Sequence, residues 1–312
     1  MTVKLTMALT KGTDVTMKKK VYILGSLNMD LVIRSPYMPV AGETVCGSDF
    51  IINPGGKGAN QAAACGKLGG EPIMAGCVGS DVFGEELLDT LSRHGVDVSR
   101  VRMTEGSSGI AVIVLAEGDN RIIVDPGANS LAGEGDVERL LSDASEGDIF
   151  LTQLENSADI VGYALRRAKE KGMLTVLNPA PWNDSVRPYL QYVDMITPNE
   201  TELALASDES DVDKGLKKLY GGGIRTVLVT LGGDGYRIYG EGRDVKGSAL
   251  KVTPVDTTAA GDTFNGALVA ELASGADIER AAEFASRCAS IACTRHGAIR
   301  SVPDRAEVAD WQ

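Results

Sequence analysis

Residues 149–177 read IFLTQLENSADIVGYALRRAKEKGMLTVL and contain one complete strand–helix–strand unit. Two short runs rich in apolar and β-branched residues, Ile149–Thr152 and Leu174–Leu177, have the length of buried strands. The segment between them, Ala158–Lys171, carries apolar residues at the three- and four-residue spacing of a helix. A strand, a crossover helix and a second strand form a βαβ unit with parallel strands, so this stretch predicts an α/β fold.

The same alternation extends on both sides of this unit. Further strand-like runs are Val21–Leu24, Ile73–Val78, Met195–Thr197 and Thr226–Leu231. Further helical patterns are Gly58–Leu68, Phe83–Arg93 and Asp213–Tyr220. The repetition predicts a mainly parallel sheet whose two faces are both covered by helices.

Two early stretches interrupt the alternation. Leu31–Phe50 contains strand-like residues among prolines and glycines but no helical pattern. Ile110–Asp125 has the pattern of a hairpin, with strands Ala111–Ala116 and Arg121–Val124 around a turn at 117–120. Together they predict a small second sheet, separate from the parallel one, and two edge hairpins of the main sheet are the alternative.

The composition of the 312-residue chain is that of a globular protein, with 43% hydrophobic and 24% charged residues. Its 31 basic and 43 acidic residues give a net charge of −12. This balance excludes nucleic acid as a partner, because phosphate contacts need clustered lysine and arginine, and it also argues against an anionic substrate. No apolar run approaches the ~18 residues of a membrane span, so we expect no membrane partner.

The cysteines and histidines give no sign of a metal cluster. Five cysteines are scattered without a Cys-x-x-Cys pair, and the chain has only two histidines. Unpaired cysteines are typical of a reducing compartment, so we expect a cytoplasmic protein.

Residues 1–20 differ from the rest of the chain. They contain five lysines and a single acid, Asp14, so that residues 21–312 carry 26 basic and 42 acidic groups, a net charge of −16. We interpret residues 1–20 as a flexible extension without a catalytic role, with Met17 as an alternative start. A mitochondrial-type presequence is the other interpretation, although the segment contains no arginine.

Polar residues follow five of the strand-like runs. Ligands of open α/β sheets bind beyond the carboxyl ends of the strands, so these residues indicate an active site along that edge. In chain order they include Asn28, Asp30, Glu155, Asn178, Asn199, Glu202, Thr230 and Gly232.

The first glycine-rich motif, Asn53–Asn60 (NPGGKGAN), precedes an alanine-rich helical pattern. Its glycines let the backbone approach a ligand, while Lys57 and Asn60 can hydrogen-bond hydroxyls or phosphates. The motif is not a P-loop, because Gly58 follows Lys57 where a P-loop has the Ser or Thr that holds Mg²⁺, and the spacing of the preceding glycines also differs. A tight strand-to-helix turn without a ligand is the alternative.

The second motif, Val255–Gly266 (VDTTAAGDTFNG), leads into a helix that continues through Leu272. Free backbone N–H groups of the small residues at this helix start form an anion hole, strengthened by the helix dipole. Asp262 lies in the first turn, where a carboxylate can accept the proton of a hydroxyl that attacks phosphorus. The motif predicts phosphoryl transfer to an alcohol, and a purely helix-stabilising acid is the alternative.

These motifs together resemble the ribokinase branch of the PfkB sugar-kinase family, over residues 21–312. Gly55–Gln61 is similar to the N-terminal signature of the family and Asp256–Ala267 to its C-terminal signature. The other similar segments are Gly127–Asn129, Asn178–Pro181, Thr197–Glu202 and Thr294–Ala298. The resemblance implies a three-layer α/β/α fold with a small β-sheet lid, formed by about residues 31–53 and 108–126.

The resemblance also implies ATP-dependent phosphorylation of the 5-hydroxyl of D-ribose to give ribose 5-phosphate and ADP. Asp262 would be the general base, and the backbone N–H groups of Ala260 and Gly261 would stabilise the transferring phosphoryl group. The residues that would hold the sugar hydroxyls are Asn28, Asp30, Gly56, Lys57, Asn60 and Glu155.

The implied cofactors are Mg²⁺ with ATP and a monovalent cation, usually K⁺. Asn199 and Glu202 match an Asn-x-x-Glu element that organises Mg²⁺ and the triphosphate, the metal through water. The residues that would border the nucleotide are Thr230, Gly232, Gly261 and Ser286. The K⁺ site would comprise Asp256, Thr258, Ala292, Arg295, Gly297 and Ser301. The lid would double as a homodimer interface.

Three alternatives remain open. The first is a related kinase of the same family that acts on deoxyribose, another sugar or a nucleoside. The second is a sugar-responsive regulatory protein without turnover, which the intact Gly261-Asp262 pair disfavours. The third is a Rossmann dehydrogenase, disfavoured because Gly25-Ser-Leu-Asn28 and not Gly-x-Gly-x-x-Gly follows the first strand.

Overall fold

The computed structural model describes residues 18–311. Its main sheet has nine strands, seven of them parallel, and two antiparallel strands at one edge. The order is β13 (Arg243–Gly247), β12 (Tyr236–Gly240), β11 (Thr226–Thr230), β10 (Met195–Ile196), β9 (Leu174–Leu177), β8 (Ile149–Thr152), β1 (Val21–Leu24), β4 (Pro72–Gly79) and β5 (Asp97–Thr104). The mainly parallel sheet confirms the predicted α/β class.

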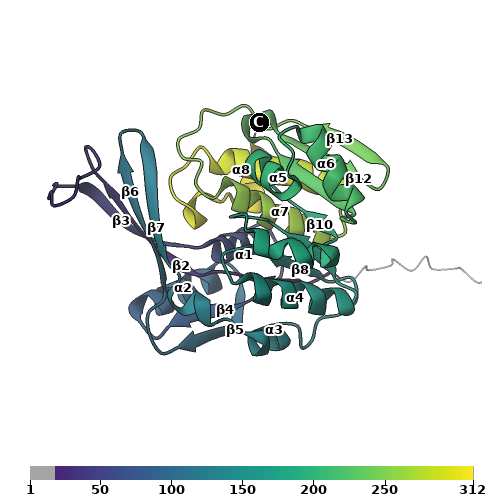
Figure 1. The fold of residues 1–312 in the computed structure, drawn as a ribbon, viewed down its shortest axis with the longest axis horizontal. Coiled ribbons are helices and arrows are strands. Elements are labelled where there is room, and N and C mark those ends of the chain that lie inside the picture. Colours follow the sequence, from purple (N-terminus) through teal and green to yellow (C-terminus); the bar gives the residue numbers. More distant parts are fainter. Residues whose placement is uncertain (1–17, 312) are drawn as a thin grey trace, which may run out of the picture.

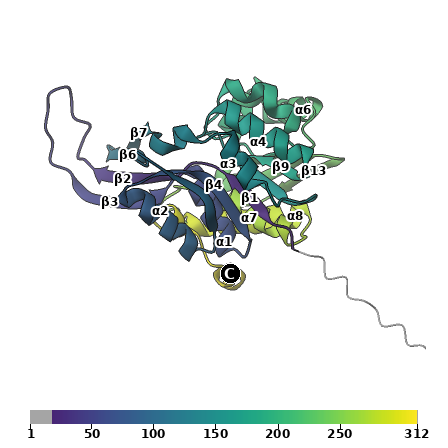
Figure 2. The ribbon, with the colours of Figure 1, turned by 90° about the horizontal axis from the view of Figure 1, so that it is seen from below.

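Helices cover both faces of this sheet, as Figures 1 and 2 show. The helices are α1 (Lys57–Lys67), α2 (Val82–Arg93), α3 (Glu134–Leu140), α4 (Ala158–Glu170), α5 (Glu200–Ser207), α6 (Val212–Gly221), α7 (Ala260–Ala273), α8 (Ile278–Ala292) and α9 (Arg305–Asp310). Side chains of β1 alternate between two buried clusters, Val21 and Ile23 in one, Tyr22 and Leu24 in the other. The first cluster includes α1, α2, α7 and α8, and the second includes α3 to α6, which confirms three layers.

Local signals at the helix ends explain where the crossover helix α4 begins and ends. The hydroxyl of Ser157 accepts a hydrogen bond from the backbone N–H of Ile160 as an N-cap. After the helix, Gly172 adopts a left-handed φ of 72° that only glycine takes without strain. This unit therefore folds as its sequence predicts.

A second, four-stranded sheet projects from the body at the left of Figure 1. Its order is β3 (Ser48–Gly55), β2 (Asn28–Arg34), β6 (Gly109–Ala116) and β7 (Asp119–Asp125). The separate sheet confirms the prediction and excludes edge hairpins of the main sheet. The hairpin turn is tighter than predicted, because Glu117 and Gly118 both take positive φ and close it with two residues. We call these four strands the lid sheet.

The lid sheet begins earlier in the chain than predicted. Strand β2 starts at Asn28, so Asn28 and Asp30 lie on the lid sheet and not in a loop beyond β1. Side chains two residues apart along a strand face the same side, so both are presented together. Two predicted sugar-binding residues thus belong to the lid sheet itself.

The predicted N-terminal extension lies mostly outside the described residues, as does Met17. Its last three residues are bound to the body: the Lys19 N–H donates to the Ala273 carbonyl and the Lys20 N–H to the Asp148 carboxylate, each over 3.0 Å. The described part of the predicted extension, residues 18–20, therefore contacts the body of the protein. Within residues 18–311, none of the helices combines the length and apolar character needed to cross a membrane.

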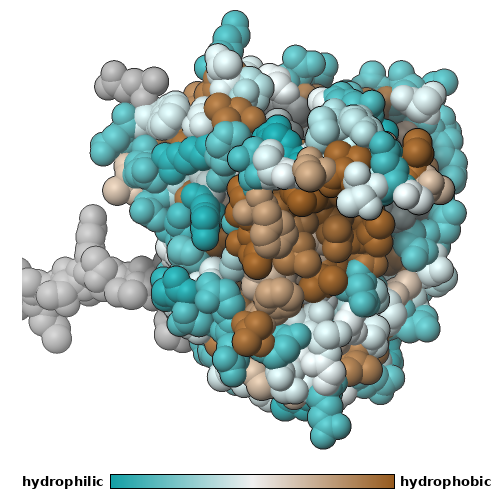
Figure 3. Space-filling view, turned by 90° about the vertical axis from the view of Figure 1, so that its left-hand side faces the viewer, coloured by the Kyte–Doolittle hydropathy of each residue, from teal (hydrophilic) through white to brown (hydrophobic). Residues whose placement is uncertain are grey.

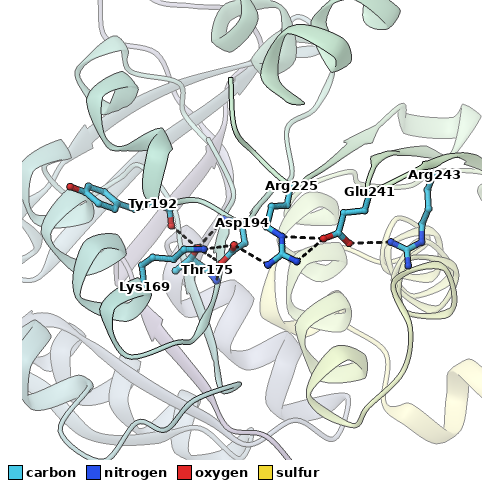
Figure 4. Close-up of polar contacts among 7 residues, drawn as sticks. All are labelled: Lys169, Thr175, Tyr192, Asp194, Arg225, Glu241 and Arg243. Atoms are coloured by element: carbon cyan, nitrogen blue, oxygen red, sulfur yellow. Dashed lines mark hydrogen bonds and ion pairs between the residues drawn. The ribbon is translucent and has the colours of Figure 1, made fainter. Parts of the chain in front are cut away.

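A buried aspartate joins the amino ends of three neighbouring strands (Figure 4). Asp194 is 4% exposed, and its Oδ2 accepts from the backbone N–H and the hydroxyl of Thr175, over 3.2 and 3.0 Å. Its Oδ1 pairs with the Lys169 ammonium and lies 3.8 Å from Arg225. Arg225 in turn pairs with the more exposed Glu241. These contacts lie at the end of the sheet opposite to the polar residues that follow the strands.

Replacing Asp194 by asparagine should lower the free energy of unfolding by about 2–3 kcal/mol, measured by urea denaturation. Both oxygens of Asp194 face hydrogen-bond donors, those of Thr175 on one side and the Lys169 ammonium on the other. The NH₂ group of asparagine is itself a donor, so it would meet another donor in either orientation. Glu241→Gln removes the same charge from the exposed end of this network and should cost less than about 1 kcal/mol. Equal losses in the two variants would contradict the role of burial.

Candidate active site

Two adjoining cavities lie beyond the carboxyl ends of the parallel strands. The smaller, of about 230 Å³, is lined among others by Lys57, Asn199, Glu202 and Asp262. The larger, of about 440 Å³, is lined among others by the predicted nucleotide residues Thr230, Gly232, Gly261 and Ser286. Both include Thr230, Thr257, Ala260 and Gly261, so they meet at the start of α7. Successive strands are added on one side of β1 as β4 and β5, and then on its other side from β8 onward. The position between β1 and β8 is therefore the topological switch point, where such sheets bind ligands.

Glu155 holds the first glycine-rich turn. One of its carboxylate oxygens, Oε2, accepts from the Lys57 backbone N–H over 3.0 Å and from the Ser26 hydroxyl over 2.5 Å. Gly56 has a φ of 88°, and a Cβ there would lie 2.7 Å from the Asn28 nitrogen, so only glycine fits. Ser26 is a residue that the sequence analysis missed. Glu155 therefore shapes the turn with one oxygen and leaves the other for a ligand.

Asn28 is fixed by Asn129, a second residue without a predicted role. The Asn129 amide donates to Asn28 Oδ1 over 2.8 Å and to the Leu27 carbonyl over 3.0 Å, and its own oxygen accepts from the Leu27 N–H. A Cβ at Gly109 would lie 2.2 Å from both amides, so glycine makes room for the pair. The similarity of Gly127–Asn129 to a segment of the family is the feature of the sequence that could have identified Asn129.

Acidic groups surround a single lysine in this part of the site. Burial, reinforced by the nearby Glu155 and Asp262 carboxylates, raises the pKa of Asp30 to about 7. Burial works against the charged ammonium of Lys57, but the carboxylates of Asp262, Glu155 and Glu202 outweigh it, and the pKa of Lys57 shifts upward. Lys57 thus stays charged and balances the acids around it.

Asp30 should make stability depend on pH. An acid whose pKa is raised by folding binds its proton more tightly in the folded state, so its contribution to stability is lost as pH rises from about 4 to about 7. Asp30→Asn should therefore be more stable than the parent chain at pH 8, by roughly 2 kcal/mol, and about equal at pH 4. Urea denaturation at the two pH values measures this. Asp119→Asn, on the exposed strand β7, is the control, and a variant destabilised at pH 8 would contradict the assignment.

The second motif forms the start of α7. Ala259 precedes the helix with a left-handed φ of 57°, an unusual conformation for alanine that is often found at functional sites. No atom lies within 4 Å of a Cβ built on Gly261, so that side of the turn is open. The Ala260 N–H differs from the prediction of free donors, because it donates to the Thr257 carbonyl over 3.2 Å. A tight turn before the helix causes this bond.

Asp262 lies at the floor of the smaller cavity and is 6% exposed. Its two oxygens accept from side-chain amides of α1: Oδ2 from Asn60 over 3.0 Å and Oδ1 from Gln61 over 2.9 Å. Asn60 Oδ1 is buried and has no hydrogen-bond partner among the described residues. A buried acceptor of this kind requires a donor, and a substrate hydroxyl would supply one. Gln61 had no predicted role.

Asn199 and Glu202 form a capping box at the start of α5. The Asn199 side chain accepts from the Glu202 N–H over 2.8 Å, and the Glu202 carboxylate accepts from the Asn199 N–H over 2.9 Å. Burial raises the pKa of Glu202. Among the described residues, no three His, Cys, Asp or Glu side chains are grouped to hold a metal ion. The hard oxygen donors of this wall nevertheless fit Mg²⁺ that keeps most of its water ligands.

The predicted K⁺ residues come from two loops that Asp256 joins. Its carboxylate accepts from the Thr258 N–H over 2.9 Å and from the Gly297 N–H over 3.0 Å. Ser301 is buried, and its hydroxyl donates to the Ala298 carbonyl. The Arg295 side chain points instead to Glu307. The structure thus brings the two loops together. Only the backbone of Arg295, and not its side chain, is available to a cation between them.

Taken together, the cavities define a class of protein. A buried carboxylate in the first turn of a helix, beside an open backbone turn and a sugar-sized polar cavity, is suited to phosphoryl transfer onto a small alcohol. The larger, mainly apolar cavity next to it is suited to a nucleotide base.

Comparison with known proteins gives the family. Residues 18–305 match the model of the pfkB family of carbohydrate kinases. A ribokinase of Haemophilus influenzae is 36% identical over 304 residues, covering 95% of this chain and 99% of the relative. A solved structure of Arabidopsis thaliana ribokinase with ribose and ATP superposes with a TM-score of 0.85, at 30% identity over 94% and 98% of the two chains. A deoxyribokinase of Salmonella typhi is 32% identical over 90% and 94%. The chain belongs to the pfkB family of carbohydrate kinases.

Proposed function

We propose that this chain phosphorylates D-ribose at the 5-hydroxyl with ATP and releases ribose 5-phosphate and ADP. The observation that carries the proposal is the position of Asp262, buried at the start of α7 beside the open Gly261 turn. The Asn60 oxygen next to it has no hydrogen-bond partner in the part of the chain that the structure describes. The similarity to ribokinases over nearly the whole chain supports it.

In the proposed reaction, the Asp262 carboxylate accepts the proton of the 5-hydroxyl as its oxygen attacks the γ-phosphorus. The new oxygen–phosphorus bond replaces the bond to the β–γ bridging oxygen, and ADP leaves with that electron pair. The Gly261 N–H, with that of Ala260 once its 3.2 Å bond to Thr257 is exchanged, donates to the transferring group. Asn199 and Glu202 would hold Mg²⁺ through its water ligands, and the metal would neutralise charge on the phosphates.

The sugar is held by the polar residues between the lid sheet and α1. Asn28 and Asp30 reach in from β2, and Asn60 and Lys57 from the first motif. Glu155 keeps one carboxylate oxygen free of the bonds that hold the turn. We propose that Asp256 and the loop carbonyls around Ala292, Arg295, Gly297 and Ser301, with Thr258, hold the monovalent cation.

ADP release across a panel of sugars and nucleosides, with and without K⁺, tests the proposed function. Dominant turnover of ribose is expected, with stimulation by K⁺. Dominant turnover of deoxyribose would support the alternative that the Salmonella typhi relative suggests. A nucleoside substrate would need an apolar wall in the lid to contact its base. The aromatic side chains available for such a wall, Tyr37 and Phe50, are 43% and 58% exposed. If no sugar or nucleoside of the panel were phosphorylated, the result would support the alternative of a regulatory protein without turnover.

We further propose that the lid sheet pairs two copies of the chain. Figure 3, viewed from the lid side, shows a broad apolar surface. Strands β3 and β7 of the lid sheet carry exposed large apolar side chains, namely Phe50, Ile51, Ile52, Ile122, Ile123 and Val124. Apolar patches of this kind mark association surfaces. Sedimentation should show a dimer that Ile123→Asp dissociates, and a monomeric parent chain would exclude it.

A further inference from the structure

We propose that Gln61 is a positioning residue that orients the carboxylate of Asp262 for proton transfer. Its Nε2 donates to Asp262 Oδ1 over 2.9 Å, while Asn60 holds the other carboxylate oxygen. Two amides on opposite oxygens prevent the carboxylate from rotating about its last bond. The inference rests on the proposed role of Asp262 as the base.

The polar atoms of Gln61 are fully used inside the protein. Besides Asp262, its Nε2 donates to Asn178 Oδ1 over 3.0 Å, and its Oε1 accepts from the Gln153 amide over 2.6 Å. Its side chain is completely buried. An amide has two donor hydrogens, and both are taken, so Gln61 has no donor left for a sugar. Asn60 differs, because its Oδ1 has no hydrogen-bond partner within residues 18–311. Asn60 is therefore suited to bind the substrate, whereas Gln61 is suited to orient the carboxylate of Asp262.

The partners of Gln61 connect Asp262 to the parallel sheet. Gln153 directly follows β8 and Asn178 directly follows β9, and the Asn178 amide donates to the carbonyl of Thr197, which directly follows β10. The amides thus link the carboxylate to the ends of three rigid strands. Networks of this type hold a catalytic group in one geometry.

Close packing of α1 against α7 makes the contact with Asp262 geometrically feasible. A Cβ on Gly266 of α7 would lie 2.5 Å from the Gln61 carbonyl and 2.5 Å from the Ala64 methyl. Glycine at this point allows the two helices to approach, which brings the Gln61 side chain to a carboxylate 201 residues further along the chain.

The test is a double-mutant cycle on turnover. Gln61→Met keeps the length of the side chain and removes its donor. We expect kcat to fall about 10- to 100-fold, with KM for ribose changed less than about 3-fold, because a group misplaced by a fraction of an ångström mainly affects the chemical step. In the Asp262→Asn background, the same change should lower the residual kcat less than about 3-fold, since no base remains to be oriented.

Asp194→Asn is the matched control for lost stability, because it removes a buried network at the opposite end of the strands. It should lower the midpoint of unfolding without changing kcat. If Gln61→Met fails to fold, Gln153→Met removes only the outer bond to Gln61 and should lower kcat about 3- to 10-fold in the parent background alone.

The outcomes separate the two proposals. A normal kcat in both Gln61→Met and Gln153→Met, or equal losses with and without Asp262, would overturn the positioning role while leaving the base intact. Near-normal turnover of Asp262→Asn would instead overturn the role of Asp262 as the base, and a parent chain that does not turn over ribose would overturn the proposed function.

Discussion

Replacing Asp262 by asparagine should lower kcat by about three orders of magnitude and leave the affinity for ribose nearly unchanged. Asparagine keeps the shape of the side chain and one hydrogen-bonding oxygen, but it cannot accept a proton from the sugar. General base catalysis contributes about 10²- to 10⁴-fold to a rate. Steady-state ADP release measures kcat, and titration calorimetry with ribose measures the affinity.

The control for this experiment is Asp194→Asn, the same chemical change at another buried aspartate. Asp194 lies at the amino ends of the strands, away from both cavities, so its loss should reduce stability and leave kcat unchanged. If Asp262→Asn turned over at a near-normal rate, Asp262 would not be the base.

The second large effect concerns the sugar hydroxyls. Ribose should be preferred over 2-deoxyribose by roughly 10⁴ in kcat/KM, because a site built to hydrogen-bond a hydroxyl leaves its own polar groups unpaired when that hydroxyl is missing. Asn28 is buried and fixed by Asn129, and Asp30 is partly buried near two other carboxylates, so both depend on the sugar hydroxyls for their remaining hydrogen bonds. Comparing initial rates on the two sugars measures the ratio.

Variants at these positions distinguish hydroxyl recognition from general damage. Asn28→Ala should lower kcat/KM for ribose much more than for 2-deoxyribose, which narrows the ratio between the sugars. Asn183→Ala, which removes an exposed helix cap elsewhere, should leave the ratio unchanged. Equal rates of the parent chain on ribose and 2-deoxyribose would refute the assignment of Asn28 and Asp30.

The net charge of −12 does not conflict with a nucleotide substrate. The candidate phosphate site is a backbone turn at Ala260 and Gly261 together with Lys57, and not a basic surface. Because Mg²⁺ neutralises much of the charge of ATP, a local arrangement of N–H groups and one lysine is sufficient.

The individual helices and strands could be predicted from the sequence because they depend on neighbouring residues. Apolar periodicity located β1, β8, β9 and α4 almost to the residue. The rule that ligands bind beyond the carboxyl ends of strands gathered Glu155, Asn199 and Thr230 at one edge. The sheet edge formed by β12 and β13, and helix α8, had no such clear pattern and were missed.

Contacts between distant residues could not be obtained in this way. Asn28 meets Asn129 across 101 residues and Asp262 meets Gln61 across 201, and no local pattern predicts either pair. Such contacts exist only after the strands have assembled in one order and the helices have packed at distances that Gly109 and Gly266 permit. The sequence by itself therefore determined the α/β class and predicted a set of polar residues for the site. The tertiary structure decided which of these residues line the cavities and which hold others in place, because a side chain's role depends on whether its polar atoms are already satisfied.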